Sequence, residues 1–293
     1  MCKKKVIPAA VVIASLAIGL AFGYLLKLRN RALIPAHLSV IFPSLTEGRC
    51  VLIQTPEGKN LMIDAGAAGD LGSITRLLAE HGVATVDLLV LTSNTESSLG
   101  SLPQLLAGSI PIRSVWMNAI AGSTLASQHA VLAIHEHQVP IRMVHSGDMD
   151  EIGPSETRLS ILWPPQAGPY ASQDPLVCRV DYANVVFIIG GTSSSASEPN
   201  MVSEDSEKLS CGDNFGVLQV ANPSKFDGTS AELLRWTTPE IAVVSIPTDQ
   251  TVAPGVLHRL GAAGAEVWRT DRQGTVTVTS DGQHAPIVSA PNT

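Results

Sequence analysis

The segment Val86–Leu91 is the feature that most restricts how this chain can fold. It reads VDLLVL, which is short, rich in branched residues and almost entirely apolar. A strand of this composition is typical of the centre of a sheet that is covered on both faces. It leads directly into a polar stretch, residues 92–98 (TSNTESS). Because sites in open α/β sheets are usually built at the carboxyl ends of central strands, the sequence predicts an α/β fold with a candidate site in this stretch.

Strand and helix patterns surround this central strand. Three apolar runs precede it, LSVIF, CVLIQT and LMIDAG, and the turn PEGKN separates the last two. Pro56 presets one backbone dihedral and Gly58 permits a positive φ, so this turn predicts a tight hairpin. The third run places Asp64 at the end of a strand. Leu71–His81 then has apolar residues at helical spacing and is followed by a glycine, which predicts a helix with a C-cap.

The second half of the chain repeats this layout. The runs LVCRVDY and NVVFIIGG predict a hairpin, and the strands FGVLQV and IAVVSIP alternate with helical patterns at 229–237 and 253–264. The strands EVWRT and TVTVTS close the fold, with TDRQGTVTV expected to form a hairpin. Two strand-rich halves with interspersed helices predict an αββα sandwich in one domain, residues 39–285, after a linker at 32–38 and before a tail at 286–293.

The N-terminal residues have the pattern of a membrane signal. Residues 6–26 contain no charge and have three basic residues on either side, so residues 1–31 are expected to form a membrane anchor with basic flanks. A cleaved signal peptide is the competing interpretation, because a small-x-small motif is present at 21–23. The apolar run exceeds the ~7–15 residues usual for a signal peptide, which favours the anchor. We therefore expect a single-pass protein of the cell membrane whose folded domain lies outside the cytoplasm.

The charge of the remaining chain argues against contact with nucleic acid. Residues 1–31 contain six of the 19 basic residues and none of the 26 acids, which leaves 13 basic residues and a formal charge of −13 for the rest. Non-specific binding to DNA draws most of its strength from Lys and Arg that displace counterions. We expect the acidic residues to lie on a solvated protein surface.

Cysteine and histidine spacing predicts no second site. The four cysteines follow no C-x-x-C pattern; they are Cys2, Cys50, Cys178 and Cys211. Cys50 and Cys178 lie in apolar strand-like runs, where a buried thiol is expected, although a disulfide stays open because sequence gives no distances. The run 135–137 (HEH) has the wrong spacing to place both imidazoles on one helix face, so it is expected to be a surface helix end.

Seven segments together resemble one known superfamily. They are TPEGKNLMIDAG, VDLLVLT with LGSLPQLL six residues later, SGD near residue 147, LSILWPP, LVCRVDYANVVFIIGG, PEIAVVSIP and, most specifically, VLHRLGAAGAEVWRTDRQGTVTVTSDG. Over most of residues 39–282 the chain resembles the metallo-β-lactamase superfamily, in particular the soluble domain of ComEC-type competence proteins, the DNA-uptake channel family. The resemblance implies the αββα fold and two divalent ions held by a His-x-Asp-x-Asp-His loop, a later Asp and further histidines. In such a site the ions lower the pKa of a bridging water, and the hydroxide attacks phosphate or carbonyl.

The positions that the resemblance assigns to metal ligands hold other residues. In the loop, the His, Asp, Asp and His positions fall on Ser93, Thr95, Ser97 and Ser98. The later Asp and His positions fall on or near Thr192, Asn222 and Thr251, and the two acidic positions of an early Asp-rich pattern fall on Ser44 and Arg49. Hydroxyl and amide groups are poor zinc donors. Asp64 is retained, and the resemblance implies that it organises the loop by hydrogen bonding.

The sequence thus favours a catalytically inactive binding or scaffold domain with no metal or cofactor. Its partner would be an unknown protein or small molecule, and the resemblance adds an accessory role in DNA uptake or envelope machinery. The alternative is a diverged metal-dependent hydrolase of phosphodiesterase or nuclease type. It would take its ligands from the Ser/Glu-rich segment 192–213, predicted to be a surface loop, whose acids are Glu204, Asp205, Glu207 and Asp213.

Overall fold

The computed structural model of this chain describes residues 37–118, 124–153, 157–165, 175–190, 198, 200–202, 209–226, 228–248 and 250–291. The expected membrane span, residues 6–26, lies outside these ranges. Within them, every helix is too short or too polar to cross a bilayer.

The first sheet has eight strands and contains both ends of the described domain. In spatial order they are β15 (Ile287–Ser289), β14 (Val276–Ser280), β1 (Leu38–Phe42), β2 (Val51–Gln54), β3 (Asn60–Ile63), β4 (Leu88–Val90), β5 (Val115–Met117) and β6 (Ile141–Met143). From β15 to β3 neighbouring strands are antiparallel, and from β3 to β6 they are parallel. The short strand predicted within 86–91 is β4, in the interior of this sheet.

The second sheet has seven strands from the later part of the chain. In spatial order they are β13 (Glu266–Arg269), β12 (Ile241–Val244), β11 (Phe215–Gln219), β10 (Val185–Gly190), β9 (Val177–Tyr182), β8 (Arg158–Trp163) and β7 (Met149–Glu151). The predicted hairpin of LVCRVDY and NVVFIIGG is the antiparallel pair β9–β10. Parallel pairing then continues from β10 to β13.

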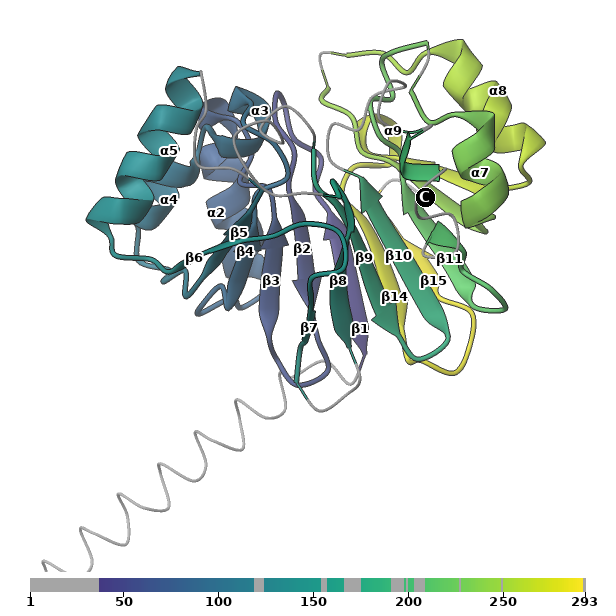
Figure 1. The fold of residues 1–293 in the computed structure, drawn as a ribbon. Coiled ribbons are helices and arrows are strands. Elements are labelled where there is room, and N and C mark those ends of the chain that lie inside the picture. The colour runs from purple at the N-terminus through teal and green to yellow at the C-terminus, as the bar shows by residue number, and fades with distance from the viewer. Residues whose placement is uncertain are drawn as a thin grey trace, which may run out of the picture.

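The two sheets pack face to face with helices outside (Figure 1). Their inner faces meet in one apolar core, in which Phe42 and Phe187 are fully buried. Full burial of one such side chain contributes about 2 kcal/mol. The outer face of the first sheet is covered by α2 (Leu71–Glu80), α3 (Glu96–Leu99), α4 (Leu102–Leu106) and α5 (Leu125–Glu136). The second sheet is covered by α7 (Ala231–Thr237) and α8 (Pro254–Ala262), and two short turns, η1 (Ala68–Asp70) and α9 (Thr270–Gln273), complete the described elements.

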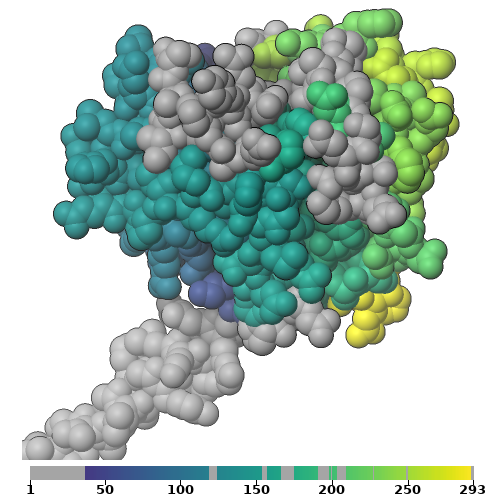
Figure 2. All heavy atoms as spheres, viewed as in Figure 1, coloured from purple at the N-terminus to yellow at the C-terminus, as the bar shows by residue number. Residues whose placement is uncertain are grey.

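The predicted mixed α/β architecture with two sheets is therefore confirmed. In a space-filling view the purple-to-teal first half and the green-to-yellow second half pack against each other as one body (Figure 2). Side chains alternate between the inner core and the two outer cores along the strands, as a sheet covered on both faces requires.

Two details at the C-terminal end differ from expectation. The segment TDRQGTVTV is not a hairpin, because β13 belongs to the second sheet and β14 to the first, and residues 270–273 form the single turn α9. The Thr270 hydroxyl accepts a hydrogen bond from the amide of Ile246 (3.1 Å), which ties α9 to the end of the neighbouring strand. The expected tail, residues 286–293, contains β15, which pairs with β14 and extends the sheet beyond residue 285.

The strand directions define two edges of the sandwich. At one edge β3, β4, β10, β11 and β12 all end, and we call this edge the mouth. A hydrogen bond from the amide of Thr248, after β12, to the carbonyl of Leu45, after β1, joins the two sheets there (3.2 Å). At the opposite edge, which we call the base, β1 begins at Leu38 beside the end of β14.

Candidate functional site

The polar loop at residues 92–98 lies at the mouth and is held from both sheets. The amide of Asp64, directly after β3, donates to the carbonyl of Val90 at the end of β4 (2.8 Å). The amide of Leu176, just ahead of β9, donates to the carbonyl of Thr92 (2.8 Å). The loop that the sequence singles out is therefore fixed where the two sheets meet.

Asp64 is a buried carboxylate that organises this loop. The residue is 3% exposed and has a positive φ of 62°, a conformation that aspartate adopts more readily than most residues. Its Oδ1 accepts a hydrogen bond from the amide of Thr92 (2.8 Å), and its Oδ2 accepts one from the Thr92 hydroxyl (2.7 Å). The hydroxyl of Ser98 also donates to this carboxylate. These contacts are those of a structural acid whose oxygens point into the protein.

The four loop positions that the resemblance assigns to metal ligands form one continuous hydrogen-bonded network with two charged residues. We call it the hydroxyl network; in order its members are Arg49, Ser97, Thr95, Ser93, Ser98 and Asp64. Nη2 of Arg49 donates to Oγ of Ser97 (3.1 Å). The Ser97 and Thr95 hydroxyl oxygens are 3.0 Å apart, and those of Thr95 and Ser93 are 2.8 Å apart. Ser93 then donates to Oγ of Ser98 (2.9 Å).

The acceptor end of this network, at Asp64, fixes the direction of the bonds between its hydroxyls. A guanidinium can only donate, and an ionised carboxylate can only accept. Each hydroxyl has one proton; Ser98 gives its proton to Asp64 and Ser93 gives its proton to Ser98, so Thr95 must donate to Ser93 and Ser97 to Thr95. Every hydroxyl therefore accepts one bond and donates one. A network paired in this way leaves no hydroxyl proton uncommitted; Ser93 and Ser98 are buried, whereas Thr95 is exposed.

Arg49 is placed by a tight loop between β1 and β2. Within this loop the Asp70 carboxylate accepts a hydrogen bond from the amide of Gly48 (2.6 Å). A Cβ atom on Gly48 would overlap the amide nitrogen of Ala67, so only glycine fits. The amide of Arg49 donates to the carbonyl of Ser97 (2.8 Å), so backbone and side chain both hold Arg49 against the polar loop.

Burial and the opposite charge shift the pKa values of Asp64 and Arg49 in opposite directions. Burial raises the pKa of Asp64 above its ordinary value, while the charge of Arg49 and the hydrogen bonds from Thr92 and Ser98 oppose that rise. Burial likewise lowers the pKa of Arg49, opposed by the charge of Asp64. Each charge is thus the principal compensation for the other in a region with little access to water.

The donor set at the mouth does not fit a divalent metal ion. Zinc, manganese and magnesium are held by imidazole, thiolate or carboxylate groups, whereas the loop offers hydroxyls that are already paired with one another. The guanidinium of Arg49 adds a fixed positive charge beside them, which repels a cation. In the described part of the chain no three His, Cys, Asp or Glu side chains converge.

The remaining positions assigned by the resemblance do not join the network in the described structure. Thr192 lies outside the described residues. Asn222 and Thr251 lie on loops of the second sheet at the mouth, and the amide of Ala253 donates to the carbonyl of Pro223 (2.8 Å), which brings these two loops together. Ser44 lies on the loop after β1, and its amide donates to the hydroxyl of a threonine that precedes β14 (3.3 Å).

The acids of the alternative hypothesis are placed only in part. Glu204, Asp205 and Glu207 lie outside the described residues. Asp213 is exposed in the turn just before β11, at the base, whereas Asn222 follows the other end of the same strand. Asp213 is therefore separated from the mouth by the length of β11.

The structure also places the cysteines and the histidine pair. Cys50, Cys178 and Cys211 are buried free thiols, as expected for the first two, and Cys2 lies outside the described residues. Burial raises the pKa of all three thiols, that of Cys211 to about 11. Residues 135–137 are exposed at the end of α5, as expected.

Two members of the mouth were missed by sequence reasoning. Thr92 was included only as part of the polar stretch, yet it gives two hydrogen bonds to Asp64. Asp70, buried at 1% exposure, holds the loop that positions Arg49. The sequence signal for Asp70 is an acid directly before a predicted helix, which alone is indistinguishable from an ordinary helix cap.

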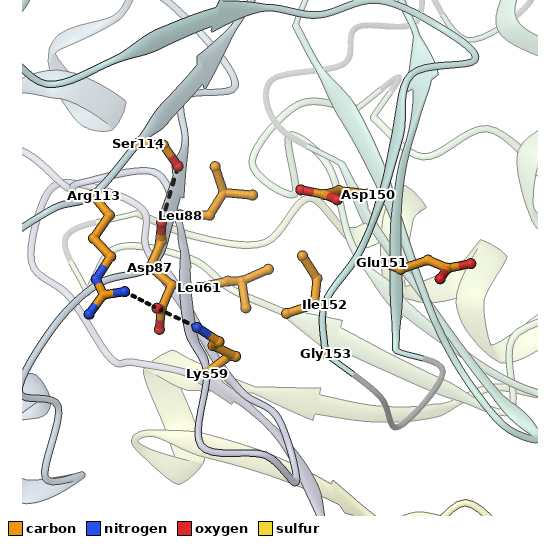
Figure 3. Close-up of a pocket in the computed structure, with 10 residues that line it drawn as sticks. All are labelled: Lys59, Leu61, Asp87, Leu88, Arg113, Ser114, Asp150, Glu151, Ile152 and Gly153. Atoms are coloured by element: carbon orange, nitrogen blue, oxygen red, sulfur yellow. Dashed lines mark hydrogen bonds and ion pairs between the residues drawn. The ribbon is translucent and has the colours of Figure 1, made fainter.

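A second polar hollow lies at the base, and we call it the base pocket (Figure 3). It is a cavity of about 280 Å³ between the starts of strands in the first sheet and the edge strand β7 of the second. Lys59 and Asp87 precede β3 and β4, Arg113 precedes β5, and Asp150 and Glu151 lie on β7. Sequence reasoning did not identify it, because its walls come from segments far apart in the chain.

Comparisons with known proteins identify the fold and no closer relationship. No protein-family model matches the sequence, and no curated protein matches it. Among solved structures, a variant of the CmlA β-hydroxylase has a TM-score of 0.52 at 12% identity, over 86% of this chain and 54% of that chain. A diphosphatase of the PhnP family has a TM-score of 0.48 at 12% identity, over 83% and 98% of the two chains. A putative metallo-β-lactamase from Thermotoga maritima has a TM-score of 0.37 at 11% identity, over 57% and 86%.

The likeness to the CmlA β-hydroxylase variant shows that this chain shares its fold over most of its length. The described chain spans about half of the CmlA protein, 54% of its length. At such low identity the likeness concerns the fold alone, and the site must be judged from its own residues.

Proposed function

We propose that this chain is a metal-independent, non-catalytic binding or scaffold domain of the metallo-β-lactamase fold, tethered to the cell membrane by residues 6–26. The observation that supports this proposal best is the hydroxyl network. Four positions that would hold His and Asp in a metal-binding relative instead hold hydroxyls that satisfy one another between Arg49 and Asp64.

The network supports the proposal that the polar groups at the mouth stabilise the fold without a metal ion. A half-lost metal site would leave buried polar groups without partners, which costs about 1–3 kcal/mol for each group. Here the loop hydroxyls are paired, and the charge of Arg49 compensates that of Asp64 where a bound cation would otherwise do so. The loop hydroxyls are therefore satisfied by side chains of this chain alone, while Nε of Arg49 is buried without a hydrogen-bond partner in the described structure.

The partner is proposed to be a protein or small molecule of the envelope. The ComEC-like motifs support an accessory role near DNA-uptake or envelope machinery, and the uncharged segment 6–26 supports a position at the membrane with the domain outside the cytoplasm. The formal charge of −13 on the rest of the chain argues against direct contact with DNA.

Metal analysis of the purified full chain tests the proposal. The protein is saturated with zinc or manganese, passed over a desalting column and measured for bound metal. We expect far less than one ion per chain, because the loop donors are hydroxyls beside a guanidinium. Two ions retained per chain at near-full occupancy would overturn the proposal.

A second candidate is a diverged metal-dependent hydrolase. The fold favours it, because CmlA is a β-hydroxylase and so an enzyme shares this architecture. Phosphodiesterase activity that is lost on chelation and in Asp213→Ala, but kept in Asp64→Asn, would support this candidate over the scaffold.

A further inference from the structure

The base pocket has one wall with a surplus positive charge. Lys59 Nζ is 3.0 Å from Oδ1 of Asp87, and Nη1 of Arg113 is 3.7 Å from the same oxygen (Figure 3). Two cations thus share one carboxylate, which also accepts a hydrogen bond from the amide of Asn60 (3.0 Å). The three side chains together retain one positive charge at the pocket.

Arg113 is the more weakly paired of the two cations. Its distance to Asp87 is too long for a hydrogen bond, and the described structure gives its guanidinium no other partner. The side chain is 64% exposed. Its planar fork of N–H donors is therefore available to an anionic group, which such a fork can bind through two parallel hydrogen bonds.

The opposite wall presents a free carboxylate. Figure 3 shows Asp150 projecting from β7 into the pocket, whereas Glu151 points away from it. Glu151 also lines the pocket, but its carboxylate points away from the cavity and its Oε1 is 4.0 Å from Nη2 of Arg158. Asp150 is exposed and has no hydrogen bond or ion pair among the described residues.

We propose that the base pocket binds a small zwitterion, with its anionic group on Arg113 and Lys59 and its ammonium group on Asp150. A simple anion in this cavity would meet the carboxylate of Asp150, and a simple cation would meet the guanidinium of Arg113. A ligand with both charges is attracted by both walls. The inner end of the pocket is closed by the buried apolar residues Leu61, Leu88 and Ile152, so a short aliphatic spacer between the two charges fits against them.

Phosphoethanolamine has this chemistry and can reach the pocket from two sources. It can arrive as a free solute or as the headgroup of a phospholipid. The pocket lies at the base, the same edge at which β1 begins, so the expected membrane segment precedes the domain on this side. The inference is independent of the hydroxyl network, which lies at the other edge of the sandwich.

Titration of the purified full chain with O-phosphoethanolamine tests the proposal. The protein is held in detergent, and binding is followed by calorimetry and by NMR. Because the pocket is open to water, we expect a dissociation constant on the order of 1 mM. Inorganic phosphate alone and ethanolamine alone should each bind about tenfold more weakly, since each meets one repelling wall.

Three variants assign the binding to the two walls. Asp150→Asn should weaken O-phosphoethanolamine about tenfold and leave inorganic phosphate no weaker than in the unaltered protein. Arg113→Gln should weaken both. Glu151→Gln is the matched control, because it removes a carboxylate of the same strand that points away from the cavity, and it should leave both affinities unchanged.

A nanodisc experiment distinguishes the two sources. The full chain is placed in phosphatidylglycerol nanodiscs with or without phosphatidylethanolamine and titrated with the soluble probe. A weaker apparent affinity in the presence of phosphatidylethanolamine supports the headgroup, and an unchanged affinity supports the free solute. The proposal is overturned if O-phosphoethanolamine binds no better than phosphate, or if Asp150→Asn and Glu151→Gln have the same effect. Metal retention at the mouth would overturn the proposed function and leave this result untouched.

Discussion

The guanidinium of Arg49 donates a 3.1 Å hydrogen bond to the hydroxyl of Ser97, although 48 residues separate them in sequence. This contact sets a permanent positive charge beside the loop to which the resemblance assigns metal ligands. It also starts the series of hydrogen bonds that ends on Asp64. The charge and the hydrogen bonding of the mouth both depend on this pair.

Restoring the loop ligands alone should give only weak zinc binding. In the variant Ser93→His/Thr95→Asp/Ser97→Asp/Ser98→His, Arg49 would pair with the new acid at position 97 and compete with the ion. Adding Arg49→Asp removes that charge, and zinc affinity measured with a competing chelator should rise by about 10–100-fold.

Arg49→Asp on its own is the control for this experiment, and it should bind no zinc because the hydroxyls remain. Equal zinc affinity with Arg49 and with Arg49→Asp in the restored loop would show that the guanidinium does not oppose the ion.

Ser98→Ala should destabilise the fold by about 1–3 kcal/mol. Ser98 is buried, and its loss leaves the donor of Ser93 and one acceptor of Asp64 without their partner. Urea unfolding of the full chain followed by circular dichroism measures the change in the free energy of unfolding.

Thr95→Ala is the matched comparison within the same network. Thr95 is exposed, so water can replace its hydroxyl, and the expected cost is about 0.5 kcal/mol or less. If the two alanine variants had equal stability, the buried part of the network would contribute nothing beyond its exposed part.

The stability of the unaltered protein should fall relative to Asp64→Asn as the pH rises above about 4, the ordinary pKa of aspartate. The folded-state pKa of Asp64 is raised by burial, so between the unfolded and folded pKa values the native state binds more protons than the unfolded state. The free energy of unfolding then decreases with increasing pH in that window.

Asp148 and Asp271 have lowered pKa values, so their contribution to the free energy of unfolding is lost as the pH falls. Both proteins share this contribution. The measured quantity is therefore the difference in unfolding free energy between the unaltered protein and Asp64→Asn. A difference in unfolding free energy that is constant from about pH 4 to pH 8 would contradict the raised pKa of Asp64.

The three described thiols should not react in the folded protein. Burial raises the pKa of Cys50, Cys178 and Cys211, so the thiolate form is scarce at pH 8 and access is blocked. In a Cys2→Ser variant, a thiol reagent such as DTNB should label no cysteine until urea is added, after which all three should react. Rapid labelling before unfolding would contradict their burial.

Much of the architecture could be predicted from local pattern. The apolar run around β4 and the turn at PEGKN specify their elements through composition alone, since buried strands and tight turns have residue requirements of their own. The resemblance to a known superfamily singled out Ser93, Thr95, Ser97 and Ser98, which do lie together.

What the sequence could not give depends on contacts between distant segments. The strands EVWRT and TVTVTS are adjacent in sequence, yet β13 and β14 belong to opposite sheets. The three-residue strand β15 is too short for its alternation to be recognised, and it forms because β14 offers it an edge. The role of Arg49 likewise rests on Asp70 and Gly48 shaping a loop, which no local pattern specifies.

The placement of β1 has one more consequence. Strands of five residues that rise about 3.3 Å each separate base and mouth by about 17 Å. For a chain held in a bilayer by its first residues, Arg49 and its neighbours would then stand nearly two nanometres further from the lipid than Lys59. In that arrangement, a macromolecule that docks on them would approach through the aqueous compartment, and molecules diffusing within the leaflet would meet the opposite side of the domain.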